Sequence, residues 1–265
     1  MLGKLLKKDF ISTCRLFLPL LCGYTIAAVV GKLLFEILLS QSRLPYDGFY
    51  NGIAIFSLFY MGICIIYLIA CYLMTSVFVV YDFYKTMVSD HGYLTHTLPV
   101  KTSTLIWSKT LMSAFWHILV NLIISLSFLL LFTGHLKEVP VMDIFRSFLH
   151  TMDSSFGSYS FYTAINAVIQ LFNSPLMFFA CIALGQLWKN HRILGAILSY
   201  IGIYVFGQIL NVIMLVATGN SSILMGSMDF FFNGYMTYAT LYGIITTVIF
   251  FLITNYILSN HLNLE

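Results

Sequence analysis

The sequence predicts an all-α polytopic membrane protein with six transmembrane helices and an amphipathic interfacial helix at its N-terminus. Of the 265 residues, 60% are hydrophobic and only 9% are charged. A soluble domain typically carries about 25% charged residues, so this apolar surplus does not fit inside one water-soluble core. In addition, six stretches have the roughly 20 apolar residues that a helix needs to cross a hydrocarbon core of about 30 Å.

The six predicted spans cover residues 16–39, 53–81, 105–132, 161–187, 193–217 and 235–258. They are expected to be helical because the backbone must satisfy its own hydrogen bonds in lipid. The second span is the longest, and helix-compatible sequence continues to about residue 89. We therefore expect this helix to project into the cytoplasm. The whole chain, 1–265, is predicted to form a single transmembrane domain.

Two further segments are amphipathic at helical spacing. The first, residues 1–13, is predicted to lie at the inner membrane interface, because apolar and basic residues occupy opposite helical faces. These residues are Leu2, Leu5, Leu6 and Phe10 against Lys4, Lys7 and Lys8. The second, residues 141–152, lies in the long loop after the third span. It is predicted to lie at the outer interface, and packing against neighbouring spans is the alternative.

Lysine and arginine predict the orientation, because cytoplasmic loops carry an excess of both. Six spans place both termini on one side, and of the 13 basic residues nine fall on that side, three on the other and one within a span. The nine are Lys4, Lys7, Lys8, Arg15, Lys85, Lys101, Lys109, Lys189 and Arg192; the three are Arg43, Lys137 and Arg146; the one is Lys32. Both termini are therefore predicted to be cytoplasmic, in a chain of the cell membrane.

Several function classes are disfavoured by what the sequence lacks. The net charge of +3 is small and no basic run exceeds Lys7-Lys8, which disfavours nucleic-acid binding. The five cysteines include no CxxC pair, so neither a disulfide framework nor a zinc site is expected. There is no GxxxxGK[ST] loop for ATP and no HExxH motif. We expect a non-catalytic chain without a cofactor or metal of its own.

Ionisable and polar residues within the predicted spans have two open interpretations each. Lys32 and Glu36 lie at i,i+4 in the first span, where they form either a structural pair near the interface or a contact for a substrate or ion. Polar residues on helical stripes in spans three to five serve either as interhelical contacts or as a path lining. These stripes are His117, Asn121 and Ser125; Asn166, Gln170 and Asn173; and Tyr204, Gln208 and Asn211.

The most specific motif lies between the second and third predicted spans. Residues 90–101 read DHGYLTHTLPVK, and Ser108-Lys109 follows near the start of the third span. This segment resembles the region after the second helix in permeases of ABC-2-type exporters, a bacterial pattern. In that family an acidic residue and GYL-x-x-TLPV precede a third helix that opens with SK. The six spans, the long second span and the amphipathic N-terminal helix agree with the resemblance.

The resemblance implies the ABC-2-type exporter permease fold and a division of labour. Two permease chains, identical or related, would form a dimeric membrane unit, and separate ATPase subunits would bind ATP and magnesium beneath it. The cargo would be an amphiphile such as a lipid, a peptide or an antibiotic-like molecule, moved outward. The family also places the second and fifth spans at the dimer seam. Tyr60 and Tyr67, with Gln208 and Asn211, are therefore expected to line the path.

The resemblance further implies that residues 90–104 hold the helix that couples the permease to its ATPase. The expected coupling residues are Asp90, Gly92, Tyr93, Leu94, Leu98 and Pro99. A physical argument agrees, because Tyr93, Leu94 and Leu98 are apolar groups with no membrane to enter and so need a protein partner. Gly92 is expected to permit a tight turn at the foot of the second helix. The alternative is an ordinary loop folded against its own spans.

Two other function classes compete with the exporter permease. An ion-coupled secondary transporter predicts inverted repeats and charged residues near the middle of the bilayer, and the sequence shows neither. A membrane-bound enzyme predicts clustered histidine and acidic residues at one membrane face, which are also missing. A neighbouring ATPase would distinguish the exporter permease from both alternatives.

Overall fold

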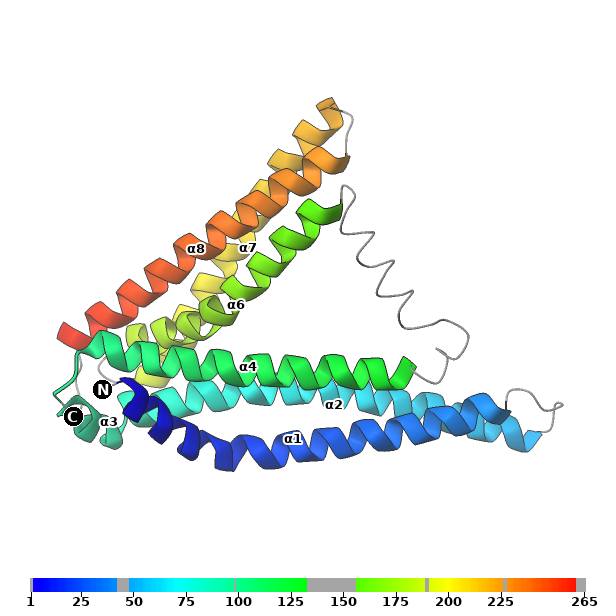
Figure 1. Ribbon diagram of the computed structural model, residues 1–265. Helices are drawn as coiled ribbons and strands as arrows, with labels where there is room; N and C mark the ends of the chain where they lie inside the picture. The colour runs from blue at the N-terminus through cyan, green and yellow to red at the C-terminus, as the bar shows by residue number, and fades with distance from the viewer. Residues whose placement is uncertain are drawn as a thin grey trace. The chain divides into compact units, whose positions relative to one another are not determined.

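The computed structural model describes residues 2–41, 48–97, 99–132, 156–188, 191–225 and 228–260. Every regular element in these ranges is an α-helix, as the composition predicts. The helices are α1 (Leu2–Gln41), α2 (Gly48–Met87), α3 (Asp90–His96), α4 (Thr102–Phe132), α6 (Phe156–Gly185), α7 (Arg192–Met225) and α8 (Met228–Asn260), as Figure 1 shows.

Four of the described helices are long and apolar enough to cross a membrane: α4, α6, α7 and α8. Helix α1 adds a fifth if its two arms are counted as one span. This arrangement is compatible with a multi-pass membrane protein. The sixth span, which the sequence predicts within the 40-residue α2, stays a prediction. The amphipathic helix predicted at 141–152 lies outside the described residues.

Helix α1 joins two segments that the sequence analysis treated separately, 1–13 and 16–39. It bends by 50° between the arms Gly3–Arg15 and Phe17–Leu33. Pro19 lies inside the helix. Proline has no N–H to donate to the carbonyl four residues earlier, here that of Arg15, and its ring crowds that carbonyl. The bend therefore has a local cause in the sequence. The interfacial location of the first arm stays a prediction.

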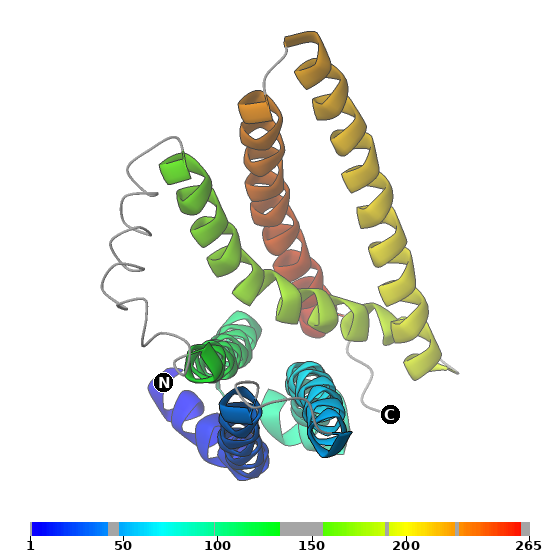
Figure 2. The ribbon, with the colours of Figure 1, turned by 90° about the vertical axis from the view of Figure 1, so that its right-hand side faces the viewer.

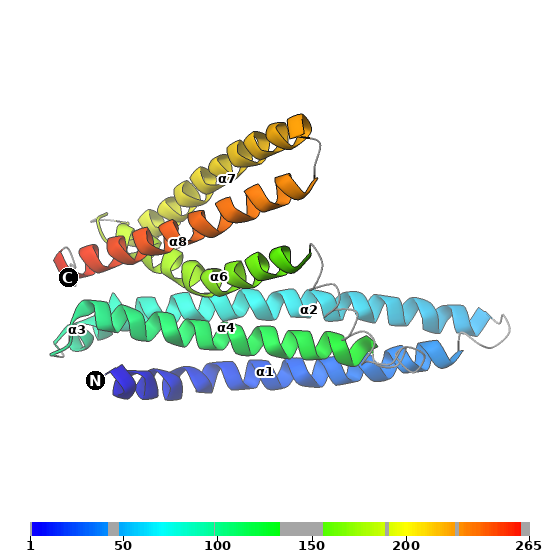
Figure 3. The ribbon, with the colours of Figure 1, turned by 45° about the horizontal axis from the view of Figure 1, so that its top comes forward.

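The chain divides into two compact units, which are described separately. The first contains Phe10–Phe78 and Phe115–Arg146, so it holds most of α1 and α2 and the end of α4. Figure 3 shows these three helices running alongside one another. The buried ring of Phe17 stacks on Trp116 of α4, with centroids 4.4 Å apart, and meets Phe78 of α2 edge-on at 5.6 Å. The Trp116 indole Nε1 donates a hydrogen bond of 2.9 Å to Thr13 Oγ1.

The same unit buries His117 in the middle of the predicted third span. Its Nε2 lies 3.5 Å from Ser76 Oγ on α2, and its ring meets Tyr72 edge-on. A histidine within a membrane span either belongs to a proton relay or is a buried, hydrogen-bonded residue with a structural role. These neighbours favour the structural interpretation.

The second unit contains Met1–Asp9, Val79–Ala114 and Ser147–Glu265. It includes α6, α7 and α8, and Figure 2 shows that α6 bends along its length. Pro175 lies inside α6 and removes one backbone hydrogen bond, which accounts for the bend. Two ring contacts join this bundle to the helix ends around α3. Phe83 of α2 stacks on Phe179 of α6 at 3.8 Å, and Trp107 of α4 lies 5.4 Å from Phe251 of α8.

Asn173 of α6 and Gly243 of α8 lie where these two helices meet. The Nδ2 of Asn173 lies 3.1 Å from the carbonyl oxygen of Gly243, 2.6 Å from Thr246 Oγ1 and 3.0 Å from Thr247 Oγ1. One turn earlier on α6, Ile169 Cγ2 lies 2.8 Å from the position that a Cβ on Gly243 would occupy. The missing side chain of Gly243 therefore lets the two helices approach closely.

Candidate functional site

The segment between α2 and α4 folds as a seven-residue helix, α3. Helix α2 ends at Met87, and the amides of Val88 and Ser89 both donate to the Tyr84 carbonyl at 3.0 Å. Ser89 is the N-cap of α3 in an extended conformation, with φ −78° and ψ −174°. A short helix here agrees with the expected coupling helix, whose role stays a prediction.

The turn at the foot of α2 is not at Gly92, and that expectation is wrong. The chain turns at Val88 and Ser89, and Gly92 lies inside α3, where it is buried. The Gly92 amide donates to the Ser89 carbonyl at 2.6 Å, which begins α3. Pro99 follows the helix and is exposed. A proline disfavours the helical conformation of the residue before it, so Pro99 limits α3 at its C-terminal side.

Helix α3 turns two large apolar side chains outward. Tyr93 is 63% exposed and Leu94 is 65% exposed, whereas Met87 and Val88 just before the helix are buried. Of the expected coupling residues, Tyr93 and Leu94 are therefore exposed and Gly92 is buried. The Asp90 side chain and Leu98 lie outside the described residues, so their expected roles stay predictions.

A second exposed apolar pair lies between α6 and α7. Leu187 and Trp188 are each about half exposed. The Trp188 ring covers the first turn of α7, because its Cγ lies 2.9 Å from the position of a Cβ on Gly195. This loop is an alternative to α3 as a docking surface, because it also exposes two large apolar side chains.

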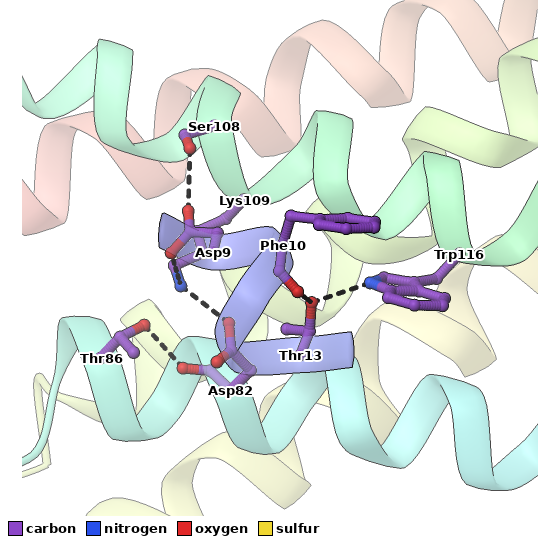
Figure 4. A network of polar contacts seen from close by, with 8 residues as sticks. All are labelled: Asp9, Phe10, Thr13, Asp82, Thr86, Ser108, Lys109 and Trp116. Atoms are coloured by element: carbon purple, nitrogen blue, oxygen red, sulfur yellow. Dashed lines mark hydrogen bonds and ion pairs between the residues drawn. The ribbon is translucent and has the colours of Figure 1, made fainter. Parts of the chain in front are cut away.

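A buried charge cluster joins three helices near α3 (Figure 4). The Nζ of Lys109 on α4 donates to Asp9 Oδ1 of α1 at 2.9 Å and to Asp82 Oδ2 of α2 at 2.7 Å. The neighbouring Ser108 Oγ donates to the second oxygen of Asp9, Oδ2, at 2.9 Å. Thr86 Oγ1 donates to the Asp82 backbone carbonyl at 2.6 Å. We call Asp9, Asp82, Ser108 and Lys109 the lysine clamp.

The charges of the lysine clamp are largely removed from solvent. The side chain of Lys109 is 8% exposed, that of Asp9 13% and that of Asp82 17%. Breaking a buried ion pair by removing one partner is strongly destabilising, by about 3–5 kcal/mol, because the remaining charge stays buried without compensation. The cluster therefore constrains the start of α1, the end of α2 and the start of α4.

Sequence reasoning missed this cluster. It placed Lys109 among the positive charges of the predicted cytoplasmic side and in the Ser108-Lys109 motif, but it gave Lys109 no partner and did not single out Asp9 or Asp82. One signal was available: Asp9 follows Leu5 and Leu6 at helical spacing, so it lies on the leucine face of the N-terminal helix. A carboxylate on an apolar face needs a partner. The partners are nearly 100 residues away, and the sequence does not identify them.

The residues expected to line a path differ in their surroundings. Gln208 is exposed on α7, and Asn211 is half-buried with its Nδ2 donating to the Gly207 carbonyl of its own helix at 2.9 Å. Tyr67 of α2 stacks on Tyr24 of α1, with ring centroids 6.2 Å apart. The Tyr60 side chain lies outside the described residues. A path role for these residues stays a prediction.

The expected pair in α1 and the polar stripes have mixed outcomes. Lys32 is half-buried, but the Glu36 side chain is outside the described residues, so their ion pair stays a prediction. Four of the eight stripe residues that carry an amide or a hydroxyl bond to carbonyls of their own helix. These are Asn121, Ser125, Asn166 and Asn211. Asn173 bonds to another helix, so the interpretation as interhelical contact is supported there.

Within the part of the chain that the structure describes, no group of three or more histidine, cysteine, aspartate or glutamate side chains could hold a metal ion. Comparison with protein-family models, curated proteins and solved structures finds no match to this chain. The function is therefore inferred from the motif at residues 90–109 and from the geometry of α3 and its supporting helices.

Proposed function

We propose that this chain is the membrane permease of an ATP-driven exporter of the ABC-2 type, and that a separate ATPase subunit docks on α3. One observation carries this proposal: α3 presents Tyr93 and Leu94, each about two-thirds exposed, at the junction of two long helices. Large apolar side chains that are exposed together in this way favour a protein partner. The resemblance of residues 90–109 to the exporter motif names the kind of partner.

The helices on both sides of α3 suit a mechanical role. α2 has 40 residues and α4 has 31, which corresponds to about 60 Å and 47 Å at 1.5 Å per residue. A force applied at α3 would act on the ends of two long helices. Buried aromatic and aliphatic anchors carry most of the energy of an interface, often about 2 kcal/mol or more each. Tyr93 and Leu94 are placed to be such anchors.

We further propose a dimeric permease, with α7 near the seam. Only 6% of the most apolar window of α7 is buried, the smallest share among the four candidate spans. Gln208 lies exposed near the middle of this helix. An amide facing lipid would lack hydrogen-bond partners, so a second permease chain or a hydrated path is the better neighbour. This supports Gln208 and Asn211 as path residues.

The lysine clamp is the observation that favours the alternative, an ion-coupled secondary transporter. Buried ionisable groups within apolar helices are often parts of ion or proton pathways. However, Lys109 already pairs with both carboxylates, and the cluster lies near the ends of α2 and α4 rather than at their centres. Transport in proteoliposomes separates the two functions. The exporter requires the ATPase and ATP, whereas the alternative needs only an ion gradient.

The docking proposal is tested by co-purification with the ATPase subunit that a tagged wild-type chain captures from native membranes. Tyr93→Ala with Leu94→Ala should reduce capture at least about tenfold, because two anchors of about 2 kcal/mol are removed. Lys101→Ala should change capture less than about fivefold, since an exposed charge contributes about 1 kcal/mol or less. Both variants should insert and retain the helical content of the wild type.

The rival surface provides the matched control. Leu187→Ala with Trp188→Ala also removes two exposed apolar side chains, and capture should stay close to that of the wild type. Full capture by the α3 variant together with loss in the control would move the docking surface to the loop between α6 and α7. If the wild-type chain captures no ATPase at all, the exporter proposal is wrong.

A further inference from the structure

We propose that Lys109 is a positioning residue for α3, because it fastens the N-terminal helix to the two helices that carry α3. This inference rests on the proposed function and deepens it. It assigns a coupling role to the lysine clamp, which neither the docking surface nor the expected path includes.

The contact between Lys109 and Asp82 closes the base of α3. The two residues are 27 positions apart, and α3 lies between them in the chain. Asp82 lies near the last turn of α2, and Lys109 lies about two turns into α4. Their 2.7 Å contact therefore joins the C-terminal end of α2 to the N-terminal end of α4, the two helices that flank α3. A displacement of α3 would then move both ends together.

Asp9 adds α1 to this assembly with a defined rotation. Its two carboxylate oxygens accept hydrogen bonds of 2.9 Å from different donors, Oδ1 from Lys109 and Oδ2 from Ser108. A carboxylate held through both oxygens is fixed in orientation as well as in distance. Lys4, Lys7 and Lys8 of the same helix are exposed. The clamp therefore determines which face of the N-terminal helix meets the chain and which face meets the surroundings.

Burial makes this clamp different from an ordinary surface ion pair. Exposed pairs contribute little because water and salt screen them. Here one ammonium group stands between two carboxylates that are themselves mostly shielded. Without Lys109, the ammonium group that links Asp9 to Asp82 would be lost, and the two like charges would repel each other. The contact between α1, α2 and α4 next to α3 would weaken. A movement of α3 would then no longer be transmitted to these three helices together.

Hydrogen exchange in lipid nanodiscs tests the clamp without any reference to transport. Lys109→Met should accelerate amide exchange in residues 2–12 at least about tenfold, whereas Lys109→Arg, which keeps the charge and the donors, should keep exchange within about threefold of the wild type. Peptides from α6 and α8 provide the internal control and should be unchanged. Equal exchange of residues 2–12 in all three proteins would show that the lysine clamp does not hold the N-terminal helix in place.

A second variant keeps the test decisive if Lys109→Met does not fold. The triple variant Asp9→Asn, Asp82→Asn and Lys109→Met carries no unpaired charge in the cluster and keeps nearly the same volume. It should retain the slow exchange of α6 and α8 and show the same acceleration in residues 2–12. Wild-type protection of residues 2–12 in this variant would also overturn the clamp.

The positioning role is tested by transport per ATP hydrolysed, in proteoliposomes with the captured ATPase. With Lys109→Met, ATPase capture and basal hydrolysis should continue within about twofold, because Tyr93 and Leu94 are untouched, and transport per ATP should fall about tenfold. Lys109→Arg should restore it. An unchanged ratio, or a parallel loss of capture, hydrolysis and transport, would overturn the positioning role. Failure of the wild type to capture an ATPase would overturn the proposed function instead, while the exchange result still decides the clamp.

Discussion

Helices α6 and α7 have the same mean hydropathy, but the structure uses them differently. In the most apolar window of α6, 44% of the residues are buried within the chain, against 6% in α7. Helix α6 packs along α8 through Ile169 and Asn173 and carries small residues such as Ala180 and Ala183 that are fully buried. Helix α7 presents most of its apolar side chains outward. Hydropathy therefore identifies a span, but local size and polarity decide what the span packs against.

The largest effect in this comparison is expected where α6 meets the start of α7. A Cβ on Gly185 would lie 2.6 Å from the Arg192 carbonyl oxygen and 2.7 Å from the Ala196 nitrogen. Both atoms are backbone, so neither can yield by a side-chain rotation. Gly185→Ala should destabilise the protein by about 3 kcal/mol, at the upper end of ordinary overpacking. Thermal unfolding in detergent measures this as a lower Tm.

Gly202→Ala on the outward side of α7 is the control for that measurement. No atom lies within 4 Å of the Cβ position of Gly202. Alanine in a helix interior is favoured over glycine by about 0.5–1 kcal/mol, so this variant should be neutral or slightly more stable. If Gly185→Ala and Gly202→Ala gave equal Tm values, the close contact between α6 and α7 would be wrong.

A smaller effect is expected at Asn173, the amide that joins α6 to α8. Asn173→Leu removes its bonds to the Gly243 carbonyl and to Thr246 and Thr247. Hydrogen bonds between membrane helices contribute about 0.6–2 kcal/mol, so a loss of about 1–2 kcal/mol is expected in the same unfolding assay. Asn166→Leu is the matched control, because the Asn166 amide bonds to the Tyr162 carbonyl within α6. A larger loss at Asn166 than at Asn173 would contradict the interhelical role.

The smallest effect on stability is expected on the outward face of α7. Gln208→Leu with Asn211→Leu leaves the described hydrogen bonds between helices intact, because Asn211 bonds to the Gly207 carbonyl of its own helix. Stability should change by less than about 0.5 kcal/mol, as is usual for exposed positions. Under the proposed function, transport or cargo-stimulated ATP hydrolysis should nevertheless change several-fold while assembly persists. Normal transport and normal stimulation would show that these residues do not line the path.

Local properties of the sequence were sufficient for the helical class and for the approximate position of most helices. Long apolar runs predicted α4, α6, α7 and α8, because a helix in lipid is selected by length and hydropathy alone. The resemblance of residues 90–101 implied a helix between α2 and α4, and α3 lies there. The turn was assigned to Gly92 incorrectly. The chain turns at Val88 and Ser89, and Ser89 is the N-cap of α3, a position that favours serine.

Contacts between residues far apart in the chain depend on how the helices pack. Asp9 and Lys109 are 100 positions apart, and their 2.9 Å contact depends on how three separate helices pack. Asn173 is one of three side-chain amides on the predicted stripe of the fourth span. It differs from Asn166 because α8 packs against it. Hydropathy and periodicity describe each helix by itself. A partner for a buried charge or amide is a property of two helices at once, so it appears only when their packing is known.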